Sequence, residues 1–198
     1  RIGAKGVGLT SGYLYPGATC PYGMVQFTPS YFSKRSGFVI NQLSGGGCEH
    51  MGNFPTFPVK GKLKMSPDNI LNYRINISEE KGHAGYYEAK VQEDIHAKLT
   101  VTERTGMASY EYPADQQYGT VIIGGGISAT PIEQAAIVIT APNKCEGYAE
   151  GGNFCGLRTP YKVYFVAEFD TDALESGTWK RDELKPNTTF AEGEYSGV

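Results

Sequence analysis

Alternation of apolar and polar residues is the feature that most constrains the fold of this 198-residue chain. Apolar and polar side chains alternate over residues 87–92, and the pattern resumes over residues 95–102 after the pair Glu93 and Asp94. A strand with one buried face has this period of two, whereas an amphipathic helix repeats about every 3.6 residues. The sequence therefore predicts two half-buried antiparallel strands joined by a short connection.

Other short segments also carry strand signals, and turn residues separate them. Further strands are predicted at residues 107–112, 119–123 and 135–140. Residues 161–169 (YKVYFVAEF) carry large side chains on both faces, which predicts a central strand covered on both sides. Residues 172–176 fit a single helical turn, and no longer window shows a helical stripe. The predicted fold class is therefore all-β, an antiparallel β-sandwich, rather than alternating βαβ units.

Length and composition predict one domain that spans residues 1–198. A chain of this length buries a sizeable core, and 40% hydrophobic with 20% charged residues is typical of globular proteins. The net charge of -3 gives no electrostatic basis for a nucleic-acid partner. No apolar run approaches the roughly 20 residues that a membrane helix needs, so no membrane span is predicted.

Four cysteines are too few for a disulfide scaffold at this length. Cys145 and Cys155 flank a short glycine-rich segment, as residues at the two feet of a hairpin would. A disulfide between them requires an oxidising compartment and close Cα atoms. Free buried thiols fit the same pattern. Both interpretations stay open from the residues alone.

Residues 41–50 (NQLSGGGCEH) bring glycines, a thiol, a carboxylate and an imidazole together. The spacing of Cys48 and His50 does not match the usual zinc pairs, and no second ligand pair is near. The segment lacks the lysine and the following hydroxyl residue of a phosphate-binding loop. His50 is also a poor base for Cys48, because neighbours two residues apart on a strand rarely hydrogen-bond. These residues favour a turn, and we assign no catalytic residue and no metal ligand in this chain.

Read in order, several segments resemble one known family. They are residues 2–8 (IGAKGVG), 15–26 (YPGATCPYGMVQ), 37–48 (GFVINQLSGGGC), 58–61 (PVKG), 85–87 (GYY), 99–106 (LTVTERTG), 110–113 (YEYP) and 163–169 (VYFVAEF). The set is similar to the motifs of glycoside hydrolase family 92, the calcium-dependent exo-α-mannosidases. The match covers most of the chain, in the same order and with sensible spacing.

The resemblance implies that this chain is the N-terminal β-sandwich, of the supersandwich type, of a larger two-domain glycosidase. The catalytic acid, the base and the calcium ligands are then expected in a C-terminal (α/α)6 domain that lies outside this sequence. The chain alone is expected to be inactive and to hold no cofactor. The resemblance further implies α-mannoside glycans and the C-terminal domain of the same polypeptide as partners. It also implies a secreted, periplasmic or cell-surface location.

The glycine loop is implied to form one wall of the sugar pocket. The substrate-binding residues predicted in this way are Gln42, Ser44, Gly45, Gly46, Gly47, Cys48, Glu49 and His50. Glycine lets a ligand approach the backbone closely, because no Cβ intervenes. The chain departs from the family at Gln42, where members often carry His or Arg. It departs again at Gly52-Asn53, where Gly-Asp is common.

Two other functions also stay open at this point. The 14 tyrosines and 9 phenylalanines suit sugar stacking, which favours a stand-alone carbohydrate-binding module. Aromatic residues also serve cores and cross-strand pairs, and glycines serve turns. A purely structural interaction domain therefore remains the third interpretation.

Overall fold

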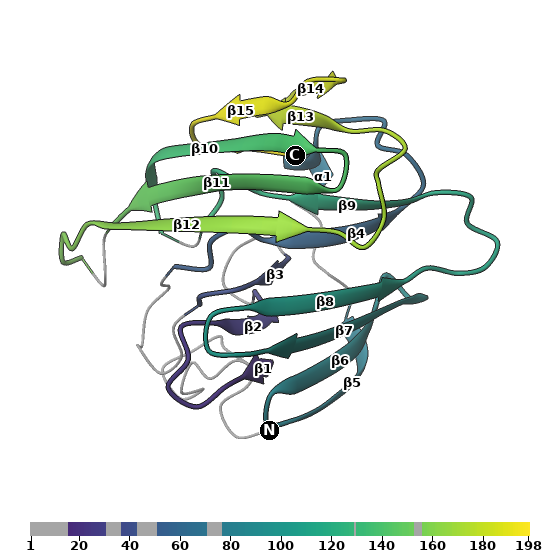
Figure 1. Ribbon diagram of the computed structural model, residues 1–198, viewed down its shortest axis with the longest axis horizontal. Helices are drawn as coiled ribbons and strands as arrows, with labels where there is room; N and C mark the ends of the chain where they lie inside the picture. Colours follow the sequence, from purple (N-terminus) through teal and green to yellow (C-terminus); the bar gives the residue numbers. More distant parts are fainter. Residues whose placement is uncertain (1–15, 31–36, 43–50, 71–76, 129, 153–155) are drawn as a thin grey trace.

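The computed structural model describes residues 16–30, 37–42, 51–70, 77–128, 130–152 and 156–198, mostly as β-strands (Figure 1). All pairings between the labelled strands are antiparallel. The predicted all-β antiparallel sandwich is confirmed. One helical turn, α1 (Pro67–Ile70), interrupts the strands, and the sequence did not predict it. No helix within the described ranges is long and apolar enough to cross a membrane.

A five-stranded sheet runs through both halves of the molecule. In spatial order its strands are β1 (Ala18–Thr19), β2 (Gln26–Pro29), β3 (Phe38–Val39), β4 (Thr56–Lys60) and β9 (Gly119–Ile123). The pair β4–β9 is covered on both faces. Phe57 and Ile122 pack against Trp179 on one side, while Ile123 packs against Ile137 on the other. This pair is therefore the part of the sheet that the other layers share.

The lower half of Figure 1 is a sandwich between β1–β3 and a second, four-stranded sheet. That sheet consists of β5 (Ile77–His83), β6 (Tyr86–Val91), β7 (Ile95–Val101) and β8 (Gly106–Glu111). The strands predicted from residues 87–102 are confirmed as β6 and β7, and their alternate residues are buried. The Tyr110 hydroxyl lies 2.6 Å from the Thr56 hydroxyl of β4. Burial raises the pKa of Tyr110, so this phenol stays protonated and links the two sheets.

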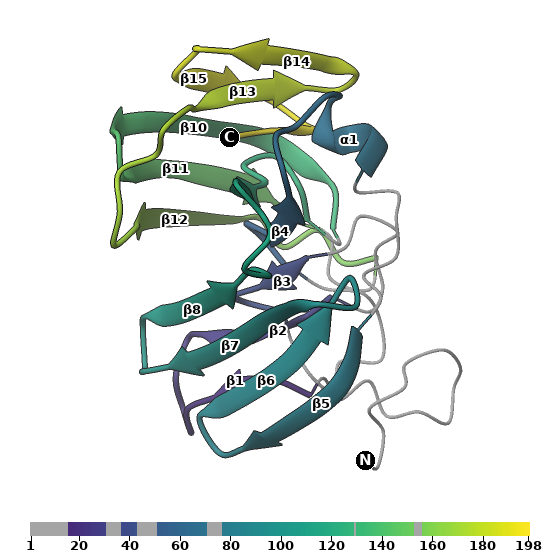
Figure 2. The ribbon, with the colours of Figure 1, turned by 90° about the vertical axis from the view of Figure 1, so that its right-hand side faces the viewer.

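The upper half adds two more sheets (Figures 1 and 2). One has the order β12 (Tyr161–Glu168), β11 (Lys144–Gly151), β10 (Ile132–Ala141) and β15 (Phe190–Glu192). The other has the order β14 (Glu183–Pro186), β13 (Gly177–Lys180) and β16 (Ser196–Gly197). These two sheets cover opposite faces of the β4–β9 pair, which places that pair in the middle layer.

Two predictions about residues 161–176 are wrong. The strand β12 is an edge strand with one covered face, not a central strand, and its residues alternate between half-buried and exposed. Its outward side chains Tyr164 and Val166 are 72% and 61% exposed, although their size suggested burial. Residues 172–176 form bends and no helical turn.

The glycines at 124–126 are positions of close backbone approach. A Cβ on Gly126 would lie 2.0 Å from the carbonyl oxygen of Gly193, and one on Gly125 would lie 2.9 Å from Ile137. The amides of Gly125 and Gly126 both donate to the Ser196 carbonyl, at 2.9 and 3.0 Å. This segment therefore serves to join β9 to β16 and is no nucleotide-binding loop.

Cys145 is a free thiol that is 2% exposed in the core of the upper half. The disulfide alternative is therefore wrong for this structure, although Cys155 itself lies outside the described residues. Burial raises the pKa of the Cys145 thiol to about 11.

The buried thiol is expected to resist alkylation. At pH 8 Cys145 is almost wholly protonated, and the thiolate is the reactive species. Iodoacetamide followed by peptide mapping should label the partly exposed Cys20 well before Cys145 in the native chain, and both alike in urea. Because the pKa in the folded chain is raised, Cys145 should also lower stability as the pH rises from about 9 to about 11. Equal labelling of both thiols in the native chain would contradict this.

The single tryptophan should be the costliest side chain to truncate. Trp179 is 1% exposed, and its ring fills the space above Gly197, where a Cβ would meet it at 2.2 Å. Trp179→Ala should lower the free energy of unfolding in urea by about 3–5 kcal/mol. Trp179→Phe should cost clearly less, because a phenyl ring still fills much of the space; both variants remove a buried indole N–H that has no partner among the described residues. Equal losses for the two variants would contradict this account.

Candidate functional site

Gln42 is the only predicted substrate-binding residue that falls within the described ranges, since Ser44 to His50 lie outside them. Its side chain is 1% exposed. Neither its amide nitrogen nor its amide oxygen has a hydrogen-bond partner among the described residues. An unpaired buried amide costs roughly 1–3 kcal/mol for each polar group. The contacts within the described part of the chain therefore do not account for the burial of this amide.

Two asparagines link the two ends of the predicted recognition loop. The Asn41 side-chain nitrogen donates to Asn53 Oδ1 at 3.0 Å, and the Asn53 backbone amide donates to Asn41 Oδ1 at 2.7 Å. Asn53 is 0% exposed. Because both bonds cross from residue 41 to residue 53, they hold the chain together on either side of residues 43–50. The sequence predicted the loop but not this pair.

A second group of hydroxyls extends the asparagine pair toward the β10–β12 sheet. Tyr161, at the start of β12, donates from its hydroxyl to Asn53 Oδ1 at 3.2 Å. The same hydroxyl lies 3.1 Å from the hydroxyl of Thr130. Ser128 donates to the Met51 carbonyl at 2.7 Å. We call Asn41, Gln42, Asn53, Ser128, Thr130 and Tyr161 the polar cluster.

The backbone next to the polar cluster is turned sharply. Met51, Gly52 and Phe54 all have left-handed φ angles, of 52°, 76° and 52°. For residues with a side chain this conformation costs about 1–2 kcal/mol each. Phe54 offsets this cost by packing, since its ring lies 4.2 Å from the ring of Phe165 in the core. Such strain occurs where a fold must hold a defined loop geometry.

The chemistry of the polar cluster is neutral. Its members are amides and hydroxyls, so they donate and accept hydrogen bonds but supply no general acid–base pair. The Asn53 side-chain nitrogen is a further buried donor without a partner. No group of three or more His, Cys, Asp and Glu residues that could hold a metal ion occurs in the described part of the chain. Within the described residues the arrangement is therefore a neutral hydrogen-bonding network.

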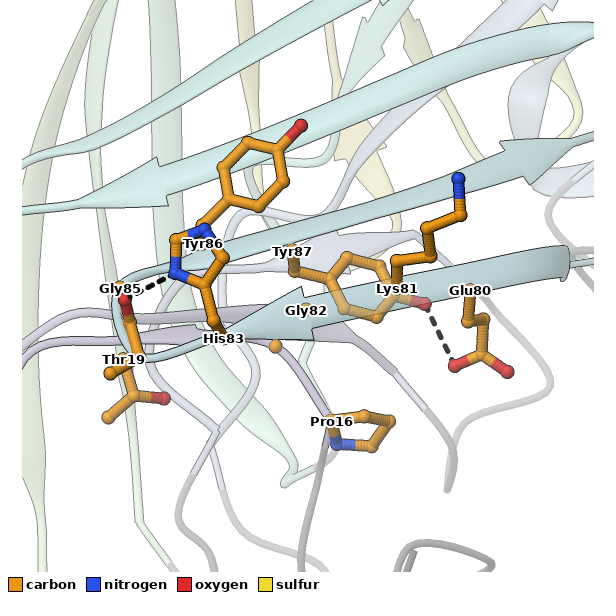
Figure 3. A pocket seen from close by; sticks show the side chains of 11 residues that line it. Pro16, Thr19, Glu80, Lys81, Gly82, His83, Gly85, Tyr86 and Tyr87 are labelled. Carbon is orange, nitrogen blue, oxygen red and sulfur yellow. Dashed lines mark hydrogen bonds between the residues drawn. The ribbon is translucent and has the colours of Figure 1, made fainter.

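A separate hollow of about 390 Å³ lies between β1 and the β5–β6 hairpin (Figure 3). Its polar groups are paired with one another. The Tyr87 hydroxyl donates to Glu80 at 3.0 Å, and the His83 ring stacks on Tyr86 at 5.1 Å. Gly85 has a φ of 77° in the hairpin turn, and its amide donates to the Thr19 carbonyl at 3.1 Å. The segment 85–87 thus builds a turn, which favours a structural role over ligand binding.

Comparison with known proteins assigns the chain to a family. Residues 1–198 match the sequence profile of the glycosyl hydrolase family 92 N-terminal domain. The chain belongs to this family. The match spans the entire chain, so it includes the polar cluster and the glycine loop together. The resemblance inferred from the ordered motifs is confirmed.

Individual relatives belong to the same kind of protein, and this chain matches only a small share of the length of each. An uncharacterized secreted glycosidase of Arthroderma benhamiae is 32% identical over 122 residues, which cover 52% of this chain and 16% of that protein. A family 92 α-mannosidase from Bacteroides thetaiotaomicron superposes with a TM-score of 0.80 at 23% identity, over 99% of this chain and 30% of that one. A family 92 inverting mannosidase from the same organism gives 0.74 at 22% identity, over 94% and 26%. The structures thus share the fold, and this chain spans less than a third of their length.

The asparagine link should contribute measurably to stability. Asn53→Ala removes the side-chain acceptor shared by Asn41 and Tyr161, which makes two part-buried hydrogen bonds, so we expect a loss of about 1–3 kcal/mol in urea unfolding. The matched control is Asn143→Ala at the β10–β11 turn, where the side chain makes one exposed bond to the Phe169 carbonyl at 3.2 Å. The control should stay within about 0.5 kcal/mol of the parent chain. Similar losses for both variants would contradict a special role for Asn53.

Proposed function

We propose that this chain is the non-catalytic N-terminal domain, over residues 1–198, of a secreted α-mannosidase of family 92. The observation that carries the proposal is the match of the whole chain to the N-terminal domain of that family. Two family 92 mannosidases with the same fold and a relative called a secreted glycosidase support the substrate class and the location. Catalysis then belongs to a C-terminal domain of the same polypeptide.

The domain's part in the reaction is to supply one wall of the glycan pocket. Gln42 and residues 44–50 lie between Asn41 and Asn53 in the sequence. The hydrogen bonds between these two asparagines link the chain on either side of the segment. Buried amides such as that of Gln42 recognise sugar hydroxyls without adding charge. The neutral chemistry of the cluster supports a role in binding and orientation.

The calcium ion expected for this family does not fit the described residues of this chain, which offer no ligand cluster. Carboxylates and carbonyl groups at a calcium site bind as a preformed set. As the resemblance to the family implies, we propose that the ion, the catalytic acid and the base belong to the C-terminal domain. No step of the reaction is assigned to residues 1–198.

The proposal is tested by comparing this chain with the longer polypeptide on aryl α-mannosides and on α-1,2-mannobiose. The longer protein should hydrolyse them and lose activity with a calcium chelator, and the 198-residue chain should be inactive. Robust hydrolysis by the 198-residue chain alone would contradict the proposal. If the longer protein hydrolyses only other glycosides, the family membership stands but the assignment of mannosides as substrates is wrong.

Within the longer protein, Glu49→Ala and Gln42→Ala should each lower kcat/KM about three- to tenfold, mainly through KM, because a lost hydrogen bond removes uniform binding. Gln117→Ala in the exposed connection between β8 and β9 is the matched control and should leave both constants unchanged. Unfolding curves for each variant separate lost binding from lost stability. Unchanged kinetics for both loop variants would favour the purely structural role, whereas glycan binding without a catalytic domain would favour the binding module.

A further inference from the structure

The two outer sheet faces of this domain differ sharply in chemistry. The face of β5–β8 carries a ladder of ion pairs across its strands. The pairs are Lys81–Glu88 at 3.3 Å, Lys90–Glu79 at 2.6 Å, and Lys98–Glu111. Such a face is satisfied by water and by its own charges. The face of β5–β8 therefore serves as a comparison for the second outer face, because its charged side chains are already paired with one another.

The outer face of β10–β12 and β15 is apolar instead. Strand register places two rows of side chains across the four strands. One row is Tyr164, Tyr148, Ala136 and Glu192, and the next is Val166, Glu146, Val138 and Phe190. Tyr164, Val166 and Phe190 are 72%, 61% and 53% exposed. A cluster of exposed aromatic and aliphatic side chains on one face marks a binding surface more often than a solvated one.

The rings on this face are held in place. Tyr148 and Tyr164 lie opposite each other on neighbouring strands, with ring centroids 6.1 Å apart and a tilt of 47°. Lys162 lies with its ammonium 4.2 Å from the centre of the Tyr148 ring and 3.2 Å from the Glu150 carboxylate. The same ammonium lies 5.8 Å from the centre of the Tyr164 ring, so these contacts hold both rings, and Tyr164 remains 72% exposed.

Two carboxylates lie within these rows, Glu192 at the end of the first and Glu146 in the middle of the second. Glu146 is exposed between Val166 and Val138, and it makes no ion pair or hydrogen bond with any described residue. A protein partner would have to bury this charge, and the centres of protein interfaces are depleted in charged residues. A sugar instead offers hydroxyl donors to the carboxylate and C–H faces to the rings.

The size of the surface points in the same direction. The groove between the rows has a volume of about 410 Å³. The two rows span roughly 14 by 7 Å, given ordinary strand spacing and rise. This length matches that of a short oligosaccharide lying across the strands.

We propose that the outer face of β10–β12 and β15 is a glycan-binding surface for a neutral oligosaccharide. Its chemistry is ring stacking on Tyr164 and Phe190 and hydrogen bonding to Glu146. The surface is distinct from the polar cluster, because Tyr161 points inward from the same β12 strand whose neighbours point outward. It is also independent of the proposed function, since it requires no catalytic domain.

The test is calorimetric titration of the 198-residue chain with mannotriose, cellotriose and maltotriose. At least one should bind, and Tyr164→Ala and Glu146→Gln should each weaken its affinity about three- to tenfold. Tyr22→Ala is the matched control, because Tyr22 is fully exposed elsewhere, and it should leave affinity unchanged. Since Tyr164 is exposed, its loss should not alter thermal unfolding.

Three outcomes would overturn the assignment. The first is the absence of binding by every trisaccharide. The second is binding that survives Tyr164→Ala and Glu146→Gln but is lost in Asn53→Ala, which would assign the sugar to the polar cluster. The third is self-association in sedimentation that disappears in Tyr164→Ala, which would assign the face to a second copy of the chain. None of these outcomes alters the hydrolysis test of the longer protein, so the two proposals fail separately.

Discussion

The burial of the β4–β9 pair on both faces is the constraint on which the rest of this domain depends. Two short strands carry Phe57 and Ile122 toward Trp179, and Ile123 toward Ile137. Each layer of the upper half is thus stabilised by the same central pair. The Thr56–Tyr110 hydrogen bond extends this dependence to the lower half. Because β4 begins only three residues after Asn53, the geometry of the loop end depends on a strand whose central residues are buried.

The sequence predicted the fold well where one face of a strand is buried and the other is exposed to solvent. The strands β6 and β7 have that pattern, and their register follows from it. The prediction failed at β12, because large residues on both faces normally mean burial on both faces. There the structure exposes Tyr164 and Val166. No local pattern distinguishes an apolar face that another layer covers from one that stays exposed. The exposure of these side chains could therefore not be predicted from the sequence.

The candidate site was predictable only in part, for a related reason. The glycine loop is continuous in sequence, and its resemblance to family motifs drew attention to Gln42. The residues that hold its ends come from distant segments, since Tyr161 lies 108 residues from Asn53 and Thr130 lies 31 from Tyr161. Asn41 and Asn53 flank the loop symmetrically, which was the one local sign of a link. Hydroxyls at strand ends have no sequence signature of their own.

The β12 strand joins these two regions through a simple rule of strand geometry. Successive side chains point to opposite faces, so Tyr161 reaches the loop end while Tyr164, three positions later, lies on the outer face. A strand at a sheet edge can therefore serve two binding surfaces without sharing a side chain between them. Substitutions on the outer face leave the hydrogen bonds of Asn53 intact, because the intervening sheet separates the two sets of contacts. The outer side chains of β12 are exposed because no layer among the described residues covers this face of the sheet, which the sequence did not predict.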